Sequence, residues 1–145
     1  MSDKFFLDTN VLVYTFDDDN PAKRDRARGL VAEALTESRG VISYQVVQEF
    51  LNAALRKFAN PLAPADAERF LSAVLAPLCA VFASVELFHL AIGVSGRWKY
   101  SFYDSLIVAA ALQSGCSILY SEDLRHGQRI EGLRIVDPFA KTSRG

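Results

Sequence analysis

Short apolar runs separated by segments of helical length are the feature that most limits how this chain can fold. Largely apolar runs bounded by Gly, Ser or acidic residues occur at Phe5–Leu7, Val41–Ile42, Ala80–Ala83, Ile118–Tyr120 and Arg134–Val136. Continuous apolar strands joined through helices are typical of a parallel sheet covered on both faces. The sequence therefore predicts an α/β fold with a central parallel sheet of about five strands and helices on both faces.

Residues that favour helix starts lie between these strands, at Asn20-Pro21, Ser43, Pro64, Ser84 and Ser101. Asn20 is expected to cap its helix, with Pro21 in the first turn. The helix after Ser101 is apolar nearly all round, so we expect it to be buried. Neither a repeat nor a linker divides the 145 residues. Residues 1–145 are therefore expected to form a single domain, with residues 139–145 as a frayed tail.

Composition limits the classes of function. The net charge of −1 argues against nucleic-acid binding through bulk positive charge, although carboxylates that hold metal ions would lower the charge of a nuclease. An acid soon interrupts the apolar N-terminus, and no apolar stretch is long enough to cross a bilayer. Cys79 and Cys116 are typical of reduced core thiols. We therefore expect a cytoplasmic protein with no membrane segment.

Two acids follow predicted strands. Asp8 comes directly after the strand Phe5–Leu7, and Asp123 follows the strand Ile118–Tyr120 after Ser121. In an open parallel sheet, ligands bind beyond the carboxyl ends of the strands. Both carboxylates are therefore expected at the same edge of the sheet.

Two other acids can be interpreted in more than one way. Asp104 lies in the first turn of the apolar helix, where it matches a capping box with Ser101. It also lies near the interior, where a buried carboxylate needs a partner or a cation. Spacing favours neither explanation. Glu49 lies away from the apolar stripe of its helix, so periodicity alone favours a solvated position.

Carboxylates that converge at a sheet edge suit a hard divalent cation, because Mg²⁺ and Mn²⁺ prefer oxygen ligands. Such an ion can activate water for attack on a phosphodiester. His89 and His126 form no evident catalytic triad with a serine and an acid, and neither a Cys/His zinc pattern nor a Gly-rich phosphate loop is present. An aspartyl-phosphate phosphatase would need a second acid where this chain has Asn10.

Four motifs in order resemble the PIN-domain ribonuclease family, and they are Phe5-Phe6-Leu7-Asp8-Thr9-Asn10-Val11-Leu12, Gln48-Glu49-Phe50, Phe102-Tyr103-Asp104-Ser105-Leu106-Ile107 and Leu119-Tyr120-Ser121-Glu122-Asp123-Leu124. The segment Arg134–Phe139 is similar to the closing strand of that family. The resemblance covers nearly the whole chain, and the size resembles the VapC-type toxins of type II toxin–antitoxin pairs. It implies a single PIN-like domain.

The resemblance also implies a site. It assigns catalysis and the binding of Mg²⁺ or Mn²⁺ to four acids, Asp8, Glu49, Asp104 and Asp123. Thr9, Asn10 and Ser121 would support this cluster. Glu122 lies beside Asp123, so either acid can face the metal, and the alignment favours Asp123. Asp8 and Asp104 would be the principal metal anchors.

The implied function is metal-dependent endonucleolytic cleavage of RNA by a homodimeric toxin that is inhibited by a cognate antitoxin. A PIN nuclease outside a toxin–antitoxin pair and a non-catalytic PIN binding module are the alternatives. The candidates for RNA contact are the basic and aromatic residues Arg97, Trp98, Lys99, Arg125 and His126. Packing or a place in a surface loop explains the presence of these residues equally well. Phe88, Leu90 and Ala91 are either a dimer seam or core.

Overall fold

The computed structural model describes residues 3–141, and within them six strands form one sheet. The strands are β1 (Phe5–Leu7), β2 (Gly40–Ser43), β3 (Cys79–Val81), β4 (Ile118–Tyr120), β5 (Arg129–Ile130) and β6 (Leu133–Val136). Their order is β3-β2-β1-β4-β6-β5, and every pairing is parallel except that between β5 and β6. The predicted α/β class is confirmed, and the short antiparallel β5 is the strand that the sequence did not predict.

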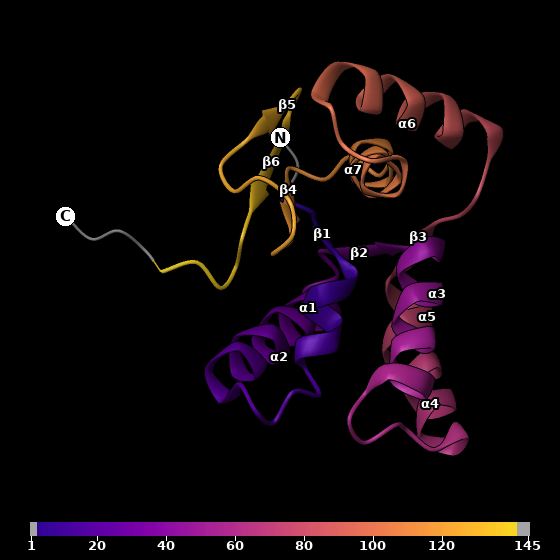
Figure 1. Cartoon of the computed structure of the whole chain (residues 1–145), viewed down its shortest axis with the longest axis vertical. Helices are drawn as coiled ribbons and strands as arrows, with labels where there is room; N and C mark the ends of the chain where they lie inside the picture. The colour runs from indigo at the N-terminus through magenta and orange to yellow at the C-terminus, as the bar shows by residue number, and fades with distance from the viewer. Residues whose placement is uncertain (1–2, 142–145) are drawn as a thin grey trace.

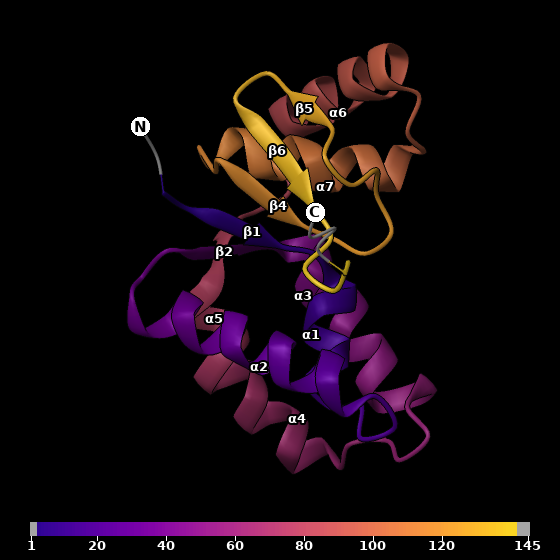
Figure 2. The same cartoon turned by 90° about the vertical axis from the view of Figure 1, so that its left-hand side faces the viewer.

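Helices cover both faces of this sheet (Figures 1 and 2). On one face lie α6 (Val85–Trp98) and α7 (Phe102–Gln113), and on the other lie α1 (Thr9–Tyr14) and α2 (Pro21–Thr36). The rest form an arm that extends away from the sheet, and they are α3 (Tyr44–Asn52), the π-helical turn η1 (Ala53–Lys57), α4 (Pro64–Phe70), the π-helical turn η2 (Leu71–Leu75) and α5 (Ala76–Leu78).

The core is built from the apolar runs that the sequence displays. Phe6, Leu7, Ile42 and Leu119 of the central strands are fully buried. In α7 every residue from 105 to 111 is buried, as its apolar sequence predicts. A cluster of four phenylalanine rings joins the end of α1 to the arm, with Phe50 of α3 fully buried at its centre.

Gly40 is required where α2 packs against the start of β2. A Cβ atom at this position would lie 2.1 Å from the Cβ of Ala34 and 2.9 Å from its Cα. Contacts this short cannot be relieved by a side-chain rotation, because one of the two atoms belongs to the backbone. The close approach of helix and strand therefore depends on the missing side chain.

The serine caps were predicted correctly, and so was the helix start at Asn20 and Pro21, but Asn20 makes no capping hydrogen bond with its side chain. Ser43, Ser84 and Ser101 each accept a hydrogen bond from a backbone N–H in the first turn of the helix that follows. The Nδ2 of Asn20 instead donates to Asp17 at 2.8 Å, a contact that turns the amide toward the preceding loop. The predicted frayed tail is residues 139–145, and its residues 142–145 lie outside the described part of the chain. Before that point, the ring of Phe139 packs edge-on against Tyr14.

The strand order places a topological switch point at the carboxyl ends of β1 and β4. β1 lies between β2 and β4, so the chain turns to opposite sides of β1 when it forms its two neighbours. This is the point of an open α/β sheet at which ligands bind. Within residues 3–141, no helix combines the length and the apolar character that are needed to cross a bilayer.

Candidate active site

Asp8 lies at this switch point. It directly follows β1 and caps the N-terminus of α1, a helix that the sequence analysis did not predict. Its carboxylate accepts a hydrogen bond of 2.7 Å from the backbone N–H of Thr9 and one of 2.8 Å from the Ser121 hydroxyl. Only 7% of the residue is exposed. A charge on this carboxylate is therefore held away from bulk water.

Burial raises the pKa of Asp8 from 3.8 to about 6. The hydrogen bonds from Ser121 and Thr9 act in the opposite direction, and the negative charges of Glu49 and Asp123 raise the pKa further. Among residues 3–141, no salt bridge reaches Asp8. The buried carboxylate therefore lacks a compensating positive charge, which a bound cation would supply.

Asn10 joins the residues at the carboxyl ends of β1 and β4. Its Nδ2 lies 3.2 Å from Asp123 Oδ2, and at longer distances of 3.4 and 3.5 Å it also faces Ser121 Oγ and Asp8 Oδ2. Its Oδ1 accepts a hydrogen bond of 3.1 Å from the backbone N–H of Glu122. One side chain thus contacts two acids that repel each other.

Glu49 of α3 reaches the residues that follow β1. It is exposed, as its place in the helical pattern predicts, but its carboxylate accepts a hydrogen bond of 2.7 Å from the Thr9 hydroxyl. The amide of Gln45, one turn earlier, donates to Glu49 at 3.1 Å and to the Tyr103 carbonyl at 3.2 Å. Gln45 was missed by the sequence analysis, although its i, i+4 spacing from Glu49 was the available signal.

Asp104 is linked to the other predicted acids indirectly, through neighbouring residues. It is half-buried in the first turn of α7, and its backbone N–H donates to the Ser101 hydroxyl at 3.2 Å. The serine half of the capping box is therefore present. Within residues 3–141, no hydrogen bond joins the Asp104 carboxylate to the other predicted acids. Its link to them runs through the neighbouring Tyr103 carbonyl and Gln45.

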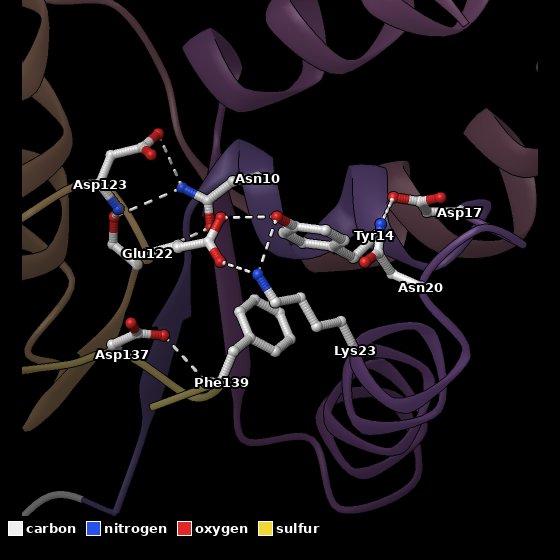
Figure 3. A network of polar contacts seen from close by, with 10 residues as sticks. Asn10, Tyr14, Asp17, Asn20, Lys23, Glu122, Asp123, Asp137 and Phe139 are labelled. Carbon is white, nitrogen blue, oxygen red and sulfur yellow. Dashed lines mark hydrogen bonds and ion pairs between the residues drawn. The ribbon is translucent and has the colours of Figure 1, made fainter. Parts of the chain in front are cut away.

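Glu122 points away from Asp123, as Figure 3 shows. Its carboxylate lies 2.6 Å from Lys23 Nζ and accepts a hydrogen bond of 2.7 Å from the Tyr14 hydroxyl. Burial acts to raise the pKa of Glu122, but the hydrogen bonds from Lys23 and Tyr14 outweigh it and lower the pKa. Glu122 is therefore ionised and bound to a cation of the protein itself.

The residues considered for RNA contacts already have partners within the protein. Arg97 lies over the Trp98 ring at 5.1 Å from its centroid, and Arg125 lies over Tyr100 at 4.8 Å and donates to the Trp98 carbonyl at 3.2 Å. His126 Nδ1 accepts a hydrogen bond from the backbone N–H of residue 137. Lys99 ends α6 in a left-handed conformation with φ of 64°. Arg97 and Lys99 thus lie at the end of α6, shortly before α7, the helix that carries Asp104.

The chemistry of the donor groups fits a hard divalent cation. Asp8, Glu49 and Asp123 supply carboxylate oxygens, and the neighbouring groups are hydroxyls and an amide, with no sulfur or imidazole among them. Among residues 3–141, no three side chains of His, Cys, Asp or Glu stand close enough together to hold a metal ion. Ligation by three acids would therefore require side-chain rotations at the exposed Glu49 and Asp123.

Comparison with known proteins gives one family. The PIN domain model matches residues 5–131. Comparison of the sequence with curated proteins gives no match.

Solved structures with this fold include the VapC20 toxin of Mycobacterium tuberculosis, which cleaves the sarcin–ricin loop, with 20% identity, a TM-score of 0.61 and coverage of 83% of this chain and 90% of the toxin. A chain of a toxin–antitoxin complex from Klebsiella pneumoniae has 19% identity and a TM-score of 0.66, with 94% and 98% covered. A chain of DNA-bound VapBC from Salmonella typhimurium has 25% identity and a TM-score of 0.58, with 92% and 96% covered.

Proposed function

The chain belongs to the PIN domain family, and on that premise we propose that it is a metal-dependent endoribonuclease and the toxin of a toxin–antitoxin pair. The observation that carries the proposal is the buried Asp8 carboxylate at the carboxyl end of β1, with Glu49 and Asp123 close enough to raise its pKa. Within residues 3–141 no salt bridge joins any of these three carboxylates to a cation of the protein, and carboxylate oxygens favour the binding of Mg²⁺ or Mn²⁺. The fold likeness to toxins of such pairs supports the biological role.

We assign the cation to Asp8 and Asp104 as principal anchors, with Glu49 completing the site or orienting water and Asp123 acting directly or through water. A bound cation would supply Lewis acidity and charge neutralisation at the scissile phosphate. The Ser121 hydroxyl and the Thr9 backbone N–H hold the Asp8 carboxylate in one orientation. The Thr9 hydroxyl does the same for Glu49.

We further propose that the protein is a homodimer. Seven large apolar side chains are exposed on one face, from 41% to 69%, and they are Tyr44, Phe82, Val85, Phe88, Ile92, Phe102 and Tyr103. Ring contacts join neighbours within this group, and Val85, Phe88 and Ile92 share one side of α6. Contiguous exposed patches of this kind mark protein interfaces. Phe88 and Ala91 were both candidates for a dimer interface in the sequence. Phe88 belongs to this exposed face, whereas Ala91 lies in the core.

An antitoxin is the second proposed partner, supported by the toxin–antitoxin complexes that share the fold. The antitoxin would be encoded beside the toxin and would obstruct the acidic residues around Asp8. The cytoplasm is the proposed location, since Cys79 and Cys116 are free thiols.

Cleavage of labelled single-stranded RNA by the purified protein tests the function. We expect cutting with Mn²⁺ or Mg²⁺, none in EDTA and none with Asp8→Asn. Asp25→Asn is the matched control, because Asp25 is exposed on α2 and pairs with Arg24, away from the predicted acids. Cutting that persists in EDTA or with Asp8→Asn would overturn the proposal. Turnover of a chromogenic phosphomonoester would instead favour a phosphatase.

A further inference from the structure

Beside the acids, the side chains of Lys23, Tyr14 and Glu122 form a polar cluster that the proposed chemistry does not use (Figure 3). Lys23 Nζ lies 2.6 Å from Glu122 Oε2, and the Tyr14 hydroxyl donates to Glu122 Oε1 at 2.7 Å. Lys23 also contacts the Tyr14 hydroxyl at 3.3 Å. All three pairs among these groups are thus in contact, and we call them the Lys23 cluster.

The Lys23 cluster is tied to four segments of the chain. Tyr14 comes from α1, Lys23 from α2 and Glu122 from the loop after β4. The Phe139 ring, near the C-terminal end of the described residues, packs against Tyr14 with centroids 4.8 Å apart and lies 5.7 Å from Lys23 Nζ. The side chains of Lys23 and Glu122 are 38% and 26% exposed, so the ion pair is partly shielded from water. These contacts restrict where the Glu122 backbone can lie.

The position of the Glu122 backbone decides the orientation of Asn10. A backbone N–H can only donate, so the Glu122 N–H requires the oxygen of the Asn10 amide, which lies 3.1 Å away. The amide NH₂ must then face the opposite way, toward Asp123 and Asp8. Rotation of the amide by half a turn would place an oxygen against two carboxylates and lose every one of these bonds.

We propose that Glu122 is a positioning residue: held by Lys23 and Tyr14, it orients Asn10 so that the Asn10 amide keeps Asp8 and Asp123 together as a pair ready to bind the cation. The inference rests on the proposed function for the presence of the cation. It assigns Asp123 to the cation and excludes Glu122, because the Glu122 carboxylate is already bound to Lys23 and Tyr14. Groups that orient metal ligands typically contribute 10-fold to 100-fold to affinity.

Mn²⁺ affinity, measured by calorimetry on the purified protein, tests the proposal. The variants remove either charge of the Lys23–Glu122 pair or exchange the two charges. We expect Lys23→Met and Glu122→Gln each to weaken Mn²⁺ binding about 10-fold. The double variant Lys23→Glu with Glu122→Lys rebuilds the ion pair and should recover most of the affinity. Arg24→Met is the matched control, because it removes a cation from the next position of α2 that pairs with Asp18 and Asp25 instead. Thermal unfolding of each variant verifies that it folds.

Two results would overturn the proposal. If Lys23→Met binds Mn²⁺ like the wild type and the exchanged pair binds as weakly as Glu122→Gln, then Glu122 is itself a ligand. If no variant changes the affinity, the Lys23 cluster does not act on the site.

A second measurement in EDTA separates this inference from the proposed function. The NMR signals of the Asn10 side-chain NH₂ should move in Lys23→Met and stay in place in Arg24→Met. A wild type that binds no Mn²⁺ would refute the metal site alone. If the Asn10 side-chain signals have the same positions in Lys23→Met as in the wild type, the positioning role is refuted, whatever the result for metal binding.

Discussion

Replacing Asp8 by Asn should stabilise the metal-free protein at neutral pH, although the same change should abolish its activity. Asp8 is only 7% exposed, and burial raises its pKa from 3.8 to about 6. An asparagine has nearly the same shape and carries no charge. Its Oδ1 can still accept from the Thr9 backbone N–H, and the Ser121 hydroxyl can rotate to accept from its Nδ2. The substitution therefore removes the charge, keeps the hydrogen bonds to Thr9 and Ser121, and loses only the long contact of 3.5 Å from Asn10 Nδ2.

The size of the effect follows from the difference between the two pKa values. The rise from 3.8 to about 6 is roughly two units. Each unit corresponds to about 1.4 kcal/mol, so ionised Asp8 costs the folded state about 3 kcal/mol at pH 7.5. Exposure is small, so solvent screening reduces this figure little. A gain of this order is a large part of the stability of an ordinary domain.

The dependence on pH has a definite sign. Because the pKa of Asp8 is higher in the folded than in the unfolded chain, the folded state binds more protons between pH 3.8 and about 6. The stability associated with protonated Asp8 is complete below pH 3.8 and is lost as the pH rises through about 6. The advantage of Asp8→Asn should accordingly shrink to about 1 kcal/mol at pH 4.5.

Urea unfolding in EDTA at pH 7.5 and pH 4.5 measures both quantities, with Asp25→Asn as the exposed control. Added Mn²⁺ should reverse the order, because the wild type gains stability by binding the ion and Asp8→Asn gains little. An Asp8→Asn protein that is less stable than the wild type at pH 7.5 would refute the reasoning. An advantage of equal size at both pH values would refute it as well.

Three further changes test the packing and the assembly. Gly40→Ala should lower the free energy of unfolding by about 1–3 kcal/mol, because the new Cβ would lie 2.9 Å from a backbone atom of α2; urea unfolding unchanged from the wild type would contradict this. Phe50→Ala should cost about 3–5 kcal/mol in the same assay, since its ring is fully buried among three other phenylalanine rings. Ile92→Glu should shift the protein from dimer to monomer in sedimentation equilibrium, whereas Leu55→Glu, which lies on the exposed side of the arm, should leave the mass unchanged; a dimer that persists in Ile92→Glu would rule out the α6 face.

The sequence by itself determined the class of fold and the strand ends that carry the acids. Continuous apolar runs can only be buried on both faces, and a chain that alternates them with helices has few ways to do so other than a parallel sheet. Asp8 and Asp123 could be placed at one edge because each follows such a run. The serine caps were also readable, since a cap depends on residues within one turn of the helix.

The short elements could not be read from the pattern. α1 spans six residues and follows directly from β1, with Asp8 as its cap, so it lacks the length over which helical periodicity shows. β5 has two residues and exists through its pairing with β6. The Asn20 side chain had a competing partner in Asp17, which local preference for a cap did not reveal.

Only the tertiary structure decided which partners the two neighbouring acids have. Glu122 and Asp123 are adjacent in sequence and carry the same chemical group, so pattern alone leaves both open. In the fold, Lys23 and Tyr14 come from elements about a hundred residues away and bind Glu122, while Asn10 contacts Asp123. A strand pattern specifies where a backbone ends, but the direction of a side chain depends on partners that only folding brings within hydrogen-bond distance.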